Sequence, residues 1–255
     1  MSATDEFNGK IVLITGTGGG QGRVAALEFA ARGAIVVGCD VNGAANDETA
    51  ALVHAAGGKM SATGAVDLGD PKQARAWVEA AAAEHGRIDI LYNNASSARF
   101  APIAEMSVED WCYTMRNEID LVFYVTRFAW RFLAKQGGVI INTASVAGHG
   151  GSKSAPIAAH ATAKGAIISF TQQAAVEGAA VGIRAVSISP GVIETPGTRE
   201  MLNSPQVRAS LMAGTLIPRP GRPEEVVALA LFLASGAAAY ITGADFVIDG
   251  GYMAV

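Results

Sequence analysis

Charged residues are scarce in this chain of 255 residues, and it contains no run of basic residues. Lysine and arginine number 19 against 23 aspartates and glutamates, which gives a net charge of −4. A nucleic-acid binder needs clustered lysine and arginine, so this balance argues against a nucleic-acid partner. The lack of a basic amphipathic helix likewise disfavours a role at a membrane surface.

Long apolar stretches are also missing. No stretch reaches the roughly 18 residues that a transmembrane helix needs, and residues 1–10 do not have the character of a secretory signal. Hydrophobic residues nevertheless make up 50% of the chain, which is enough to bury a substantial core. We therefore expect a cytoplasmic protein without a membrane partner.

Cysteine is nearly absent, since Cys39 and Cys112 are the only two. They lie far apart, and their spacing matches neither a metal-ligand motif nor a disulfide framework. Two isolated thiols are typical of a reducing compartment. The sequence therefore predicts no metal site, and we interpret both cysteines as small, partly buried side chains.

Short β-rich runs alternate with longer alanine-rich helical segments along the whole chain. The expected strands are residues 11–15, 35–39, 59–66, 88–93, 139–143, 184–189 and 246–249, and the expected helices are residues 23–32, 48–56, 71–85, 108–133, 160–180 and 224–233. Several strands are continuous apolar runs, as strands buried on both faces require. The alternation predicts a single α/β domain over residues 1–255, a doubly wound, Rossmann-type parallel sheet with helices on both faces.

Two stretches interrupt this alternation. Residues 149–155 are rich in glycine and serine, and residues 192–220 are rich in proline, glycine and threonine. Both follow the carboxyl ends of expected strands, where open α/β sheets bind their ligands. Because long loops in compact domains often close over ligands, we expect residues 192–220 to form a substrate lid.

A glycine-rich turn, Thr15-Gly16-Thr17-Gly18-Gly19-Gly20-Gln21-Gly22, follows the first expected strand and opens the first helix. Glycines permit a tight turn and let backbone N–H groups approach a pyrophosphate without interference from Cβ. The N-terminus of the helix adds positive potential for that phosphate. A glycine-rich string alone is also compatible with a simple turn, but its position between strand and helix favours a dinucleotide site.

Asp40 ends the second expected strand, at the separation typical of the acidic residue that binds an adenosine ribose. A carboxylate there hydrogen-bonds the 2′-hydroxyl and repels a 2′-phosphate. The glycine turn contains no arginine or lysine that could receive such a phosphate. The alternative, that Asp40 caps a loop, is less favoured, so the sequence predicts NAD in preference to NADP.

From about Gly9 to Gly251, these features resemble the short-chain dehydrogenase/reductase family. The resemblance implies that the cofactor is bound by Gly16, Gly20, Gln21, Gly22, Asp40, Asp67, Leu68, Asn94, Ala95, Lys164, Pro190, Gly191, Ile193 and Thr195. Ser145, in Asn-Thr-Ala-Ser, matches the catalytic serine of the family. After the motif Asn-Asn-Ala the family usually carries glycine, where this chain has Ser96.

The resemblance also carries expectations for the whole molecule. It implies a seven-stranded parallel sheet and hydride transfer at the nicotinamide ring. It further implies assembly as a homotetramer or homodimer, with contacts supplied by the helices expected at 108–133 and 160–180.

The catalytic signature of the family, Tyr-x-x-x-Lys, is altered in this chain. Lys164 matches, but the tyrosine position holds His160. The two positions lie one helical turn apart, so the imidazole is expected next to Lys164. Imidazole titrates near neutral pH and can accept a proton from an alcohol. The alternative is a structural histidine without a catalytic role. His149, four residues after Ser145, is a weaker candidate for contact with substrate.

A second departure concerns the helix expected at 108–133. The supporting asparagine of the family aligns with Glu118, and Asn117 lies one residue earlier. Neighbouring positions on a helix point about 100° apart, so the two residues do not interchange, and we expect Glu118 to face inward. The hypothesis is an altered tetrad. In it, Ser145 holds the substrate oxygen, His160 moves the proton, Lys164 binds the nicotinamide ribose, and Glu118 orients the two cations.

The sequence thus predicts an NAD-dependent oxidoreductase that interconverts a secondary alcohol and a ketone of small or medium size. Two alternatives remain open because fold alone does not decide function. One is a non-redox enzyme of the same fold, such as a dehydratase, epimerase or lyase that uses His160 as a base. The other is an NAD-binding sensor without turnover.

Overall fold

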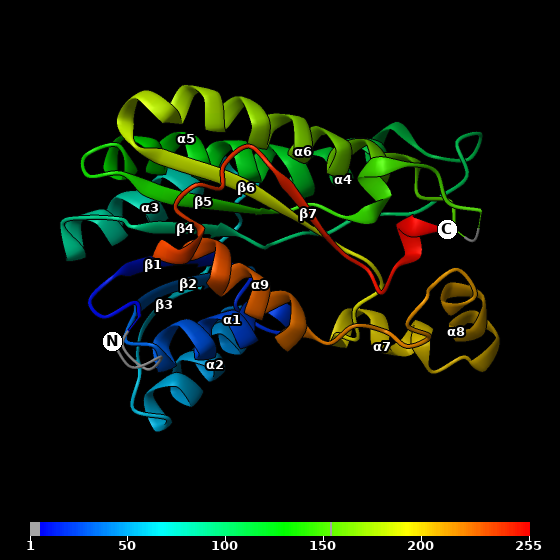
Figure 1. Ribbon diagram of the computed structural model, residues 1–255, viewed down its shortest axis with the longest axis horizontal. Coiled ribbons are helices and arrows are strands. Elements are labelled where there is room, and N and C mark those ends of the chain that lie inside the picture. The colour runs from blue at the N-terminus through cyan, green and yellow to red at the C-terminus, as the bar shows by residue number, and fades with distance from the viewer. Residues whose placement is uncertain (1–5, 154) are drawn as a thin grey trace.

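Seven parallel strands form the centre of the molecule, and the computed structural model describes residues 6–153 and 155–255 (Figure 1). The strands are β1 Ile11–Thr15, β2 Ile35–Asp40, β3 Lys59–Ala65, β4 Ile90–Asn93, β5 Gly138–Thr143, β6 Ile183–Pro190 and β7 Asp245–Ile248. Their order across the sheet is β3-β2-β1-β4-β5-β6-β7. The order reverses between β1 and β4, as in doubly wound folds, and so the predicted fold class is confirmed.

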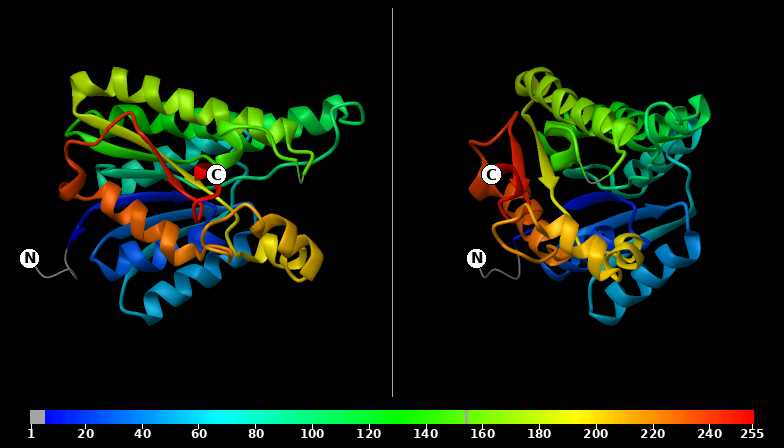
Figure 2. Two further views of the ribbon diagram at one scale, coloured as in Figure 1. Left: turned by 45° about the vertical axis from the view of Figure 1, so that its right-hand side comes forward. Right: turned by 90° about the vertical axis from the view of Figure 1, so that its right-hand side faces the viewer.

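Helices cover both faces of the sheet (Figure 2). On one face lie α1 Gly20–Ala31, α2 Gly43–Ala55 and α9 Pro223–Ala234, and on the other lie α3 Pro71–His85, α5 Leu121–Leu133 and α6 Ala158–Gly178. Alternate residues of β1 serve the two layers, because Val12 and Ile14 pack with the first group whereas Ile11 and Leu13 pack with the second. Burial on both faces explains the continuous apolar runs of the strands.

Three helices start two or more residues earlier than the sequence predicts. α1 begins at Gly20 rather than at residue 23, α2 at Gly43 rather than at 48, and α6 at Ala158 rather than at 160. At the start of α2 the side chain of Asn42 accepts a hydrogen bond from the backbone N–H of Ala45 at 3.1 Å. Asparagine is a strong N-cap, and this signal outweighs the weak apolar periodicity of the first turn.

The segment predicted as one helix over 108–133 is divided by a π-helical turn. The α-helix α4, Val108–Met115, runs into a π turn at Arg116–Asp120 and continues as α5. Such turns inside α-helices occur frequently at functional sites. Glu118 lies within this turn and is 1% exposed.

Residues 192–220, predicted as a long loop, contain two short helices, α7 Pro196–Leu202 and α8 Pro205–Met212. Each begins with a proline at its first turn, after Thr195 and Ser204 as the N-cap residues. Capping residues followed by proline are a helix-start signal, which the composition of the segment concealed. Both helices project from the sheet beyond the end of β6 (Figure 1).

The longest helix, α6, packs against β6 and the segment that follows β5. None of the helices in the described part of the chain is long and apolar enough to cross a bilayer.

Candidate active site

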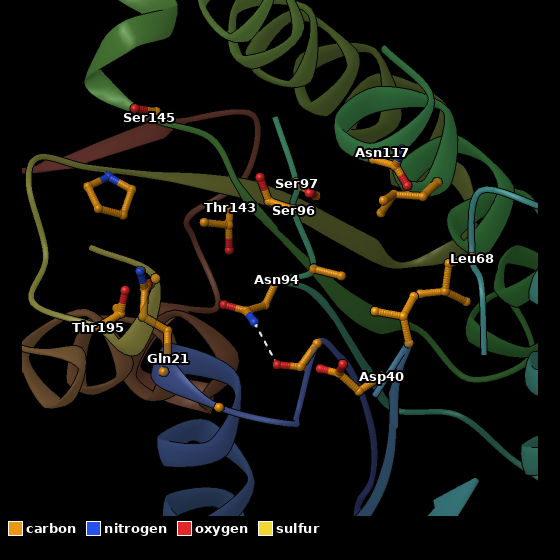
Figure 3. A pocket seen from close by; sticks show the side chains of 18 of the residues that line it. Gln21, Asp40, Leu68, Asn94, Ser96, Ser97, Asn117, Thr143, Ser145 and Thr195 are labelled. Atoms are coloured by element: carbon orange, nitrogen blue, oxygen red, sulfur yellow. Dashed lines mark hydrogen bonds between the residues drawn. The ribbon is translucent and has the colours of Figure 1, made fainter. Parts of the chain in front are cut away.

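A cavity of about 600 Å³ lies at the carboxyl ends of the strands (Figure 3). Most of the residues predicted to bind the cofactor line it: Gly16, Gly20, Gln21, Asp40, Asp67, Leu68, Asn94, Ala95, Lys164, Pro190, Gly191 and Thr195. Ser145 and His160 line the same cavity. The structure therefore gathers most of the predicted cofactor and catalytic residues around one space, whereas the predicted catalytic residue Glu118 is buried and does not line it.

Two predicted cofactor residues do not line this cavity. Gly22 lies behind the glycine turn, where an added Cβ would stand 1.9 Å from the carbonyl oxygen of Gly16. Ile193 is 5% exposed, bridges to Gly221, and lines a smaller cavity together with Met212 and Ile217. The backbone carbonyl of Ile193 accepts a hydrogen bond from Thr198 Oγ1 at 2.6 Å.

The turn after β1 presents bare backbone to the cavity. Gly20 has a φ of +52°, and an added Cβ at Gly19 would meet nothing within 4 Å. The N-terminus of α1 has no side-chain cap, so its first N–H groups are available to an anion. Gln21 Oε1 is buried without a partner in the described part of the protein, and it can accept a hydrogen bond from a hydroxyl. These features fit a dinucleotide.

The end of β4 is fixed to the end of β1 by Thr15. The hydroxyl of Thr15 accepts hydrogen bonds from the backbone N–H groups of Asn94 and Ala95, both at 2.9 Å. Asn94 Nδ2 donates in turn to the carbonyl oxygen of Thr15 at 3.1 Å. These three hydrogen bonds position the glycine turn against the motif Asn-Asn-Ala.

A cluster of connected polar side chains next to the cavity consists of Ser96, Glu118, His160 and Lys164. His160 Nδ1 lies 2.9 Å from both carboxylate oxygens of Glu118. Lys164 Nζ lies 3.9 Å from Glu118 Oε1 and donates to the carbonyl oxygen of Thr143 at 2.9 Å. Ser96 Oγ donates to Glu118 Oε1 at 2.5 Å. Glu118 is therefore the centre of the cluster.

Two charges of this cluster are buried, since the side chains of Glu118 and Lys164 are 1% and 4% exposed. Burial raises the pKa of Glu118, but the hydrogen bond from His160 and the charge of Lys164 outweigh it, so the pKa lies below its ordinary value. Burial lowers the pKa of Lys164, against the attraction of Glu118. Glu118 is thus ionised at neutral pH. An ionised carboxylate only accepts, so Nδ1 of His160 is the donor.

The segment after β5 brings Ser145 to the same space. The side chain of Ser145 accepts a hydrogen bond from the N–H of Ala147 at 3.1 Å, within a 3₁₀ turn at Val146–His149. This turn packs closely on α6, because an added Cβ at Gly148 would stand 2.7 Å from the backbone of Lys164. His149 Nε2 pairs instead with Asp245 Oδ2 at 2.8 Å, which ties the turn to β7.

Asn117 and Glu118 serve different neighbours. Glu118 contacts His160 and Lys164 on α6, as expected for the inward residue. Asn117 lines the cavity (Figure 3), and its Nδ2 donates to the carbonyl oxygen of Tyr113 at 2.8 Å. Asn117 therefore belongs to the wall of the cavity, whereas Glu118 lies buried behind His160 and Lys164.

Known proteins resemble this chain over nearly its full length. A family model described as enoyl-(acyl carrier protein) reductase matches residues 16–253. The chain is 36% identical to meso-2,3-butanediol dehydrogenase of Serratia marcescens, over 96% of this chain and 95% of that protein. It is also 36% identical to cyclohexanol dehydrogenase of Acinetobacter sp. (strain SE19), over 98% and 97% of the two chains. A solved short-chain type dehydrogenase/reductase from Mycobacterium marinum shares its fold with a TM-score of 0.93 at 34% identity, covering 99% of this chain and 98% of that chain. The chain belongs to the short-chain dehydrogenase/reductase family.

One similar solved structure is described as a complex with a cofactor and a second ligand. It is a 7α-hydroxysteroid dehydrogenase complexed with NADH and 7-oxo glycochenodeoxycholic acid, with a TM-score of 0.92 and 28% identity over 98% of this chain and 97% of that chain. Short-chain dehydrogenases/reductases use nicotinamide cofactors, and the protein described here is an oxidoreductase of this family.

Three residues of this short-chain dehydrogenase/reductase lie at the site although sequence reasoning gave them no role. Ser96 was visible only as a departure from glycine. Arg116 Nη2 pairs with Asp67 Oδ2 at 2.5 Å, and the exposed ring of Phe100 lies edge-on to His160 with centroids 5.7 Å apart. Arg116 and Phe100 come from segments remote from their partners, and no spacing along the chain indicates those contacts.

Proposed function

We propose that this short-chain dehydrogenase/reductase catalyses the NAD-dependent interconversion of a secondary alcohol and a ketone, with His160 in place of the family's tyrosine as the acid/base. The observation that carries the proposal is the contact of His160 Nδ1 with the buried carboxylate of Glu118. With Nδ1 committed as a donor, Nε2 is the ring nitrogen available for proton exchange. A carboxylate behind an imidazole fixes the tautomer and stabilises the imidazolium that forms.

Each residue of the tetrad has one role in this proposal. The hydroxyl of Ser145 holds the substrate oxygen. His160 Nε2 takes the hydroxyl proton when an alcohol is oxidised and returns it when a ketone is reduced. Lys164, anchored to the carbonyl oxygen of Thr143, binds the ribose next to the nicotinamide, and Glu118 orients His160. Bound NAD supplies the nicotinamide carbon that accepts or donates the hydride.

Other residues around the cavity make the remaining contacts with the cofactor. Backbone N–H groups of the glycine turn bind the pyrophosphate, and the carboxylate of Asp40 binds the adenosine ribose. Gly22 contributes by permitting the turn, and Ile193 contributes through its backbone in the segment that begins with Pro190 and Gly191. NAD is preferred to NADP because the carboxylate of Asp40 repels a 2′-phosphate.

The substrate in this proposal is a small or medium alcohol, and residues 192–220 close over it. The names of the relatives, a butanediol dehydrogenase and a cyclohexanol dehydrogenase, support this substrate class. The start of the lid abuts the cofactor turn, since an added Cβ at Gly20 would stand 3.4 Å from the side chain of Thr195. Closure of the lid therefore responds to what the turn binds.

We also propose that the protein assembles as a homotetramer or homodimer in the cytoplasm. Helices α4, α5 and α6 carry large apolar side chains that are open to solvent in the single chain. Trp111 is 37%, Phe123 48% and Val176 70% exposed. Two cysteines that form no disulfide, Cys39 and Cys112, accord with a reducing compartment.

The test measures reduced nicotinamide by absorbance with NAD and a panel that includes 2,3-butanediol and cyclohexanol. We expect turnover by the wild type and a loss of about 10²- to 10⁴-fold in kcat for His160→Gln, because acid/base catalysis contributes about that much. His54→Gln is the matched control, since His54 contacts the carbonyl oxygen of Met60 away from the cavity, and it should retain full activity.

Other outcomes discriminate the alternatives. Full activity of His160→Gln would remove His160 from the mechanism. Product formed without a change in absorbance would support a dehydratase, epimerase or lyase. Binding of NAD without product from any substrate of the panel would support a sensor.

A further inference from the structure

Ser96 occupies the position after Asn-Asn-Ala where related proteins usually carry glycine. Its hydroxyl donates a hydrogen bond of 2.5 Å to Glu118 Oε1. The same oxygen lies 2.9 Å from His160 Nδ1 and 3.9 Å from Lys164 Nζ. Ser96, Glu118 and His160 all depart from the family pattern, and the three side chains form one connected group.

The carboxylate of Glu118 is in contact with two groups on α6 that compete for it. His160 and Lys164 lie one helical turn apart, and both reach Oε1. Attraction between unit charges is strong in a site with so little solvent, so the ammonium of Lys164 draws the carboxylate towards itself. Ser96 is a neutral donor from a different segment, the one that follows β4. Its hydrogen bond opposes rotation of the carboxylate towards Lys164.

We propose that Ser96 is a positioning residue of this enzyme, whose hydroxyl holds Glu118 in the orientation that binds His160 Nδ1 and leaves Lys164 for the cofactor. The inference rests on the proposed function of His160. Ser96 exchanges no proton with the substrate in this scheme, since its single hydroxyl hydrogen is directed at Glu118. Its effect on the reaction passes entirely through Glu118.

Kinetics of two variants test this role. Ser96→Ala removes the hydroxyl, and Ser96→Thr retains it in a residue exposed enough to accept a methyl group. We expect Ser96→Ala to lower kcat about 10- to 100-fold, the effect of losing a hydrogen bond to a charged group, and to raise KM for NAD as Lys164 turns to Glu118. Ser96→Thr should restore kcat to within about twofold of the wild type.

A matched control shows whether losing a serine–glutamate hydrogen bond elsewhere in the protein has the same effect. Ser61 Oγ donates to Glu84 Oε1 at 3.2 Å on the protein surface. Ser61→Ala deletes that bond and should leave kcat and KM unchanged. If Ser96→Ala does not fold, Ser96→Gly is used in its place, because related proteins tolerate glycine at this position.

Nitrogen-15 NMR of histidine-labelled protein supplies a readout that needs no turnover. The wild type should show His160 protonated on Nδ1 in its neutral form, with the signals assigned by comparison with His160→Gln. Ser96→Ala should show a mixture of tautomers, and Ser96→Thr should return the wild-type pattern.

The proposal is overturned if Ser96→Ala keeps the wild-type tautomer, whether kcat falls or not, because a fall without a change of tautomer means a merely structural role. Failure of the proposed function has a different signature. In that case His160→Gln retains the kcat of the wild type, or the wild type shows no turnover. The tautomer of His160 would still change in Ser96→Ala.

Discussion

The carboxylate of Asp40 accepts hydrogen bonds from the backbone N–H groups of Gly18 and Asn42, at 2.8 and 2.9 Å. Each oxygen keeps a lone pair for a sugar hydroxyl. The cation next to the turn, Arg23, is already engaged, because it donates to the carbonyl oxygen of Gly18 at 2.9 Å and pairs with Glu48 at 2.6 Å. An extra phosphate at this position would therefore meet a negative charge and no free partner in Arg23.

Substitution of Asp40 should weaken discrimination between the two cofactors. We expect the wild type to have a higher kcat/KM with NAD than with NADP, and Asp40→Ser to narrow that ratio about tenfold or more, since a charged hydrogen bond to the ribose and the repulsion of the 2′-phosphate are both lost. Steady-state kinetics with both cofactors measure the ratio. The exposed Asp47→Ser serves as control, and an unchanged ratio for Asp40→Ser would assign the preference to another group.

The burial of one residue could be predicted from its place relative to a family motif. Glu118 was expected to face inward from its place five residues before Phe123, and it is 1% exposed. Its bond to Ser96 was beyond sequence reasoning, because the two residues are 22 positions apart and belong to different segments. A hydrogen bond between side chains of separate elements leaves no periodic signal along the chain.

Among the secondary-structure elements, the buried strands and the long helices were the most predictable. All seven strands lie close to their predicted positions, and for most of them an apolar run of four to eight residues between turns is the signal. β3, Lys59–Ala65, is an exception, because most of its residues are not buried. The π turn at Arg116–Asp120 was missed, since apolar periodicity on both sides continues as if the helix were uninterrupted. α7 and α8 were missed because short, half-exposed helices carry little periodicity, and only their capping residues indicate them.

If residues 192–220 form a lid, bound cofactor should protect this segment from proteolysis. Trypsin can cut after Arg199 and Arg208, both of which are exposed on α7 and α8. We expect saturating NAD to slow cleavage at both sites severalfold, because Thr195 at the start of α7 abuts the glycine turn. Mass spectrometry of the fragments measures the two rates. Cleavage after the exposed Lys72 on α3 is the internal control and should not change. Equal rates with and without NAD would show that the segment does not respond to the cofactor.

In the molecule as a whole, Asp89 connects two central strands at the end of the sheet opposite the cavity. This residue is 5% exposed and accepts hydrogen bonds from Lys10 Nζ at 3.1 Å, from the N–H of Ile11 at 3.0 Å, and from Arg87. Burial raises the pKa of Asp89, but the hydrogen bonds from Arg87, Ile11 and Lys10 outweigh it, and the pKa is lowered. Asp89 thus joins the start of β1 to the start of β4.

The lowered pKa of Asp89 predicts how the free energy of unfolding changes with pH. A carboxyl group whose pKa is depressed by folding stabilises the protein above its unfolded value and loses that contribution as pH falls through the folded value. Asp89→Asn should therefore lower the free energy of unfolding by about 1–3 kcal/mol at pH 7. The difference from the wild type should shrink below about pH 4. Urea unfolding across this range measures it, with Asp47→Asn as an exposed control. A difference that persists unchanged at low pH would contradict the role of the charge.

The parallel order of the sheet has a consequence for how the protein is made. Of the strands of this sheet, β1 is synthesised before its neighbours β2 and β4, and its register with β4 joins residues nearly 80 positions apart. At synthesis rates of about 5–20 residues per second, β1 waits several seconds for that neighbour. Until then one edge of the nascent sheet carries unpaired N–H and C=O groups, which is the kind of surface that chaperones shield.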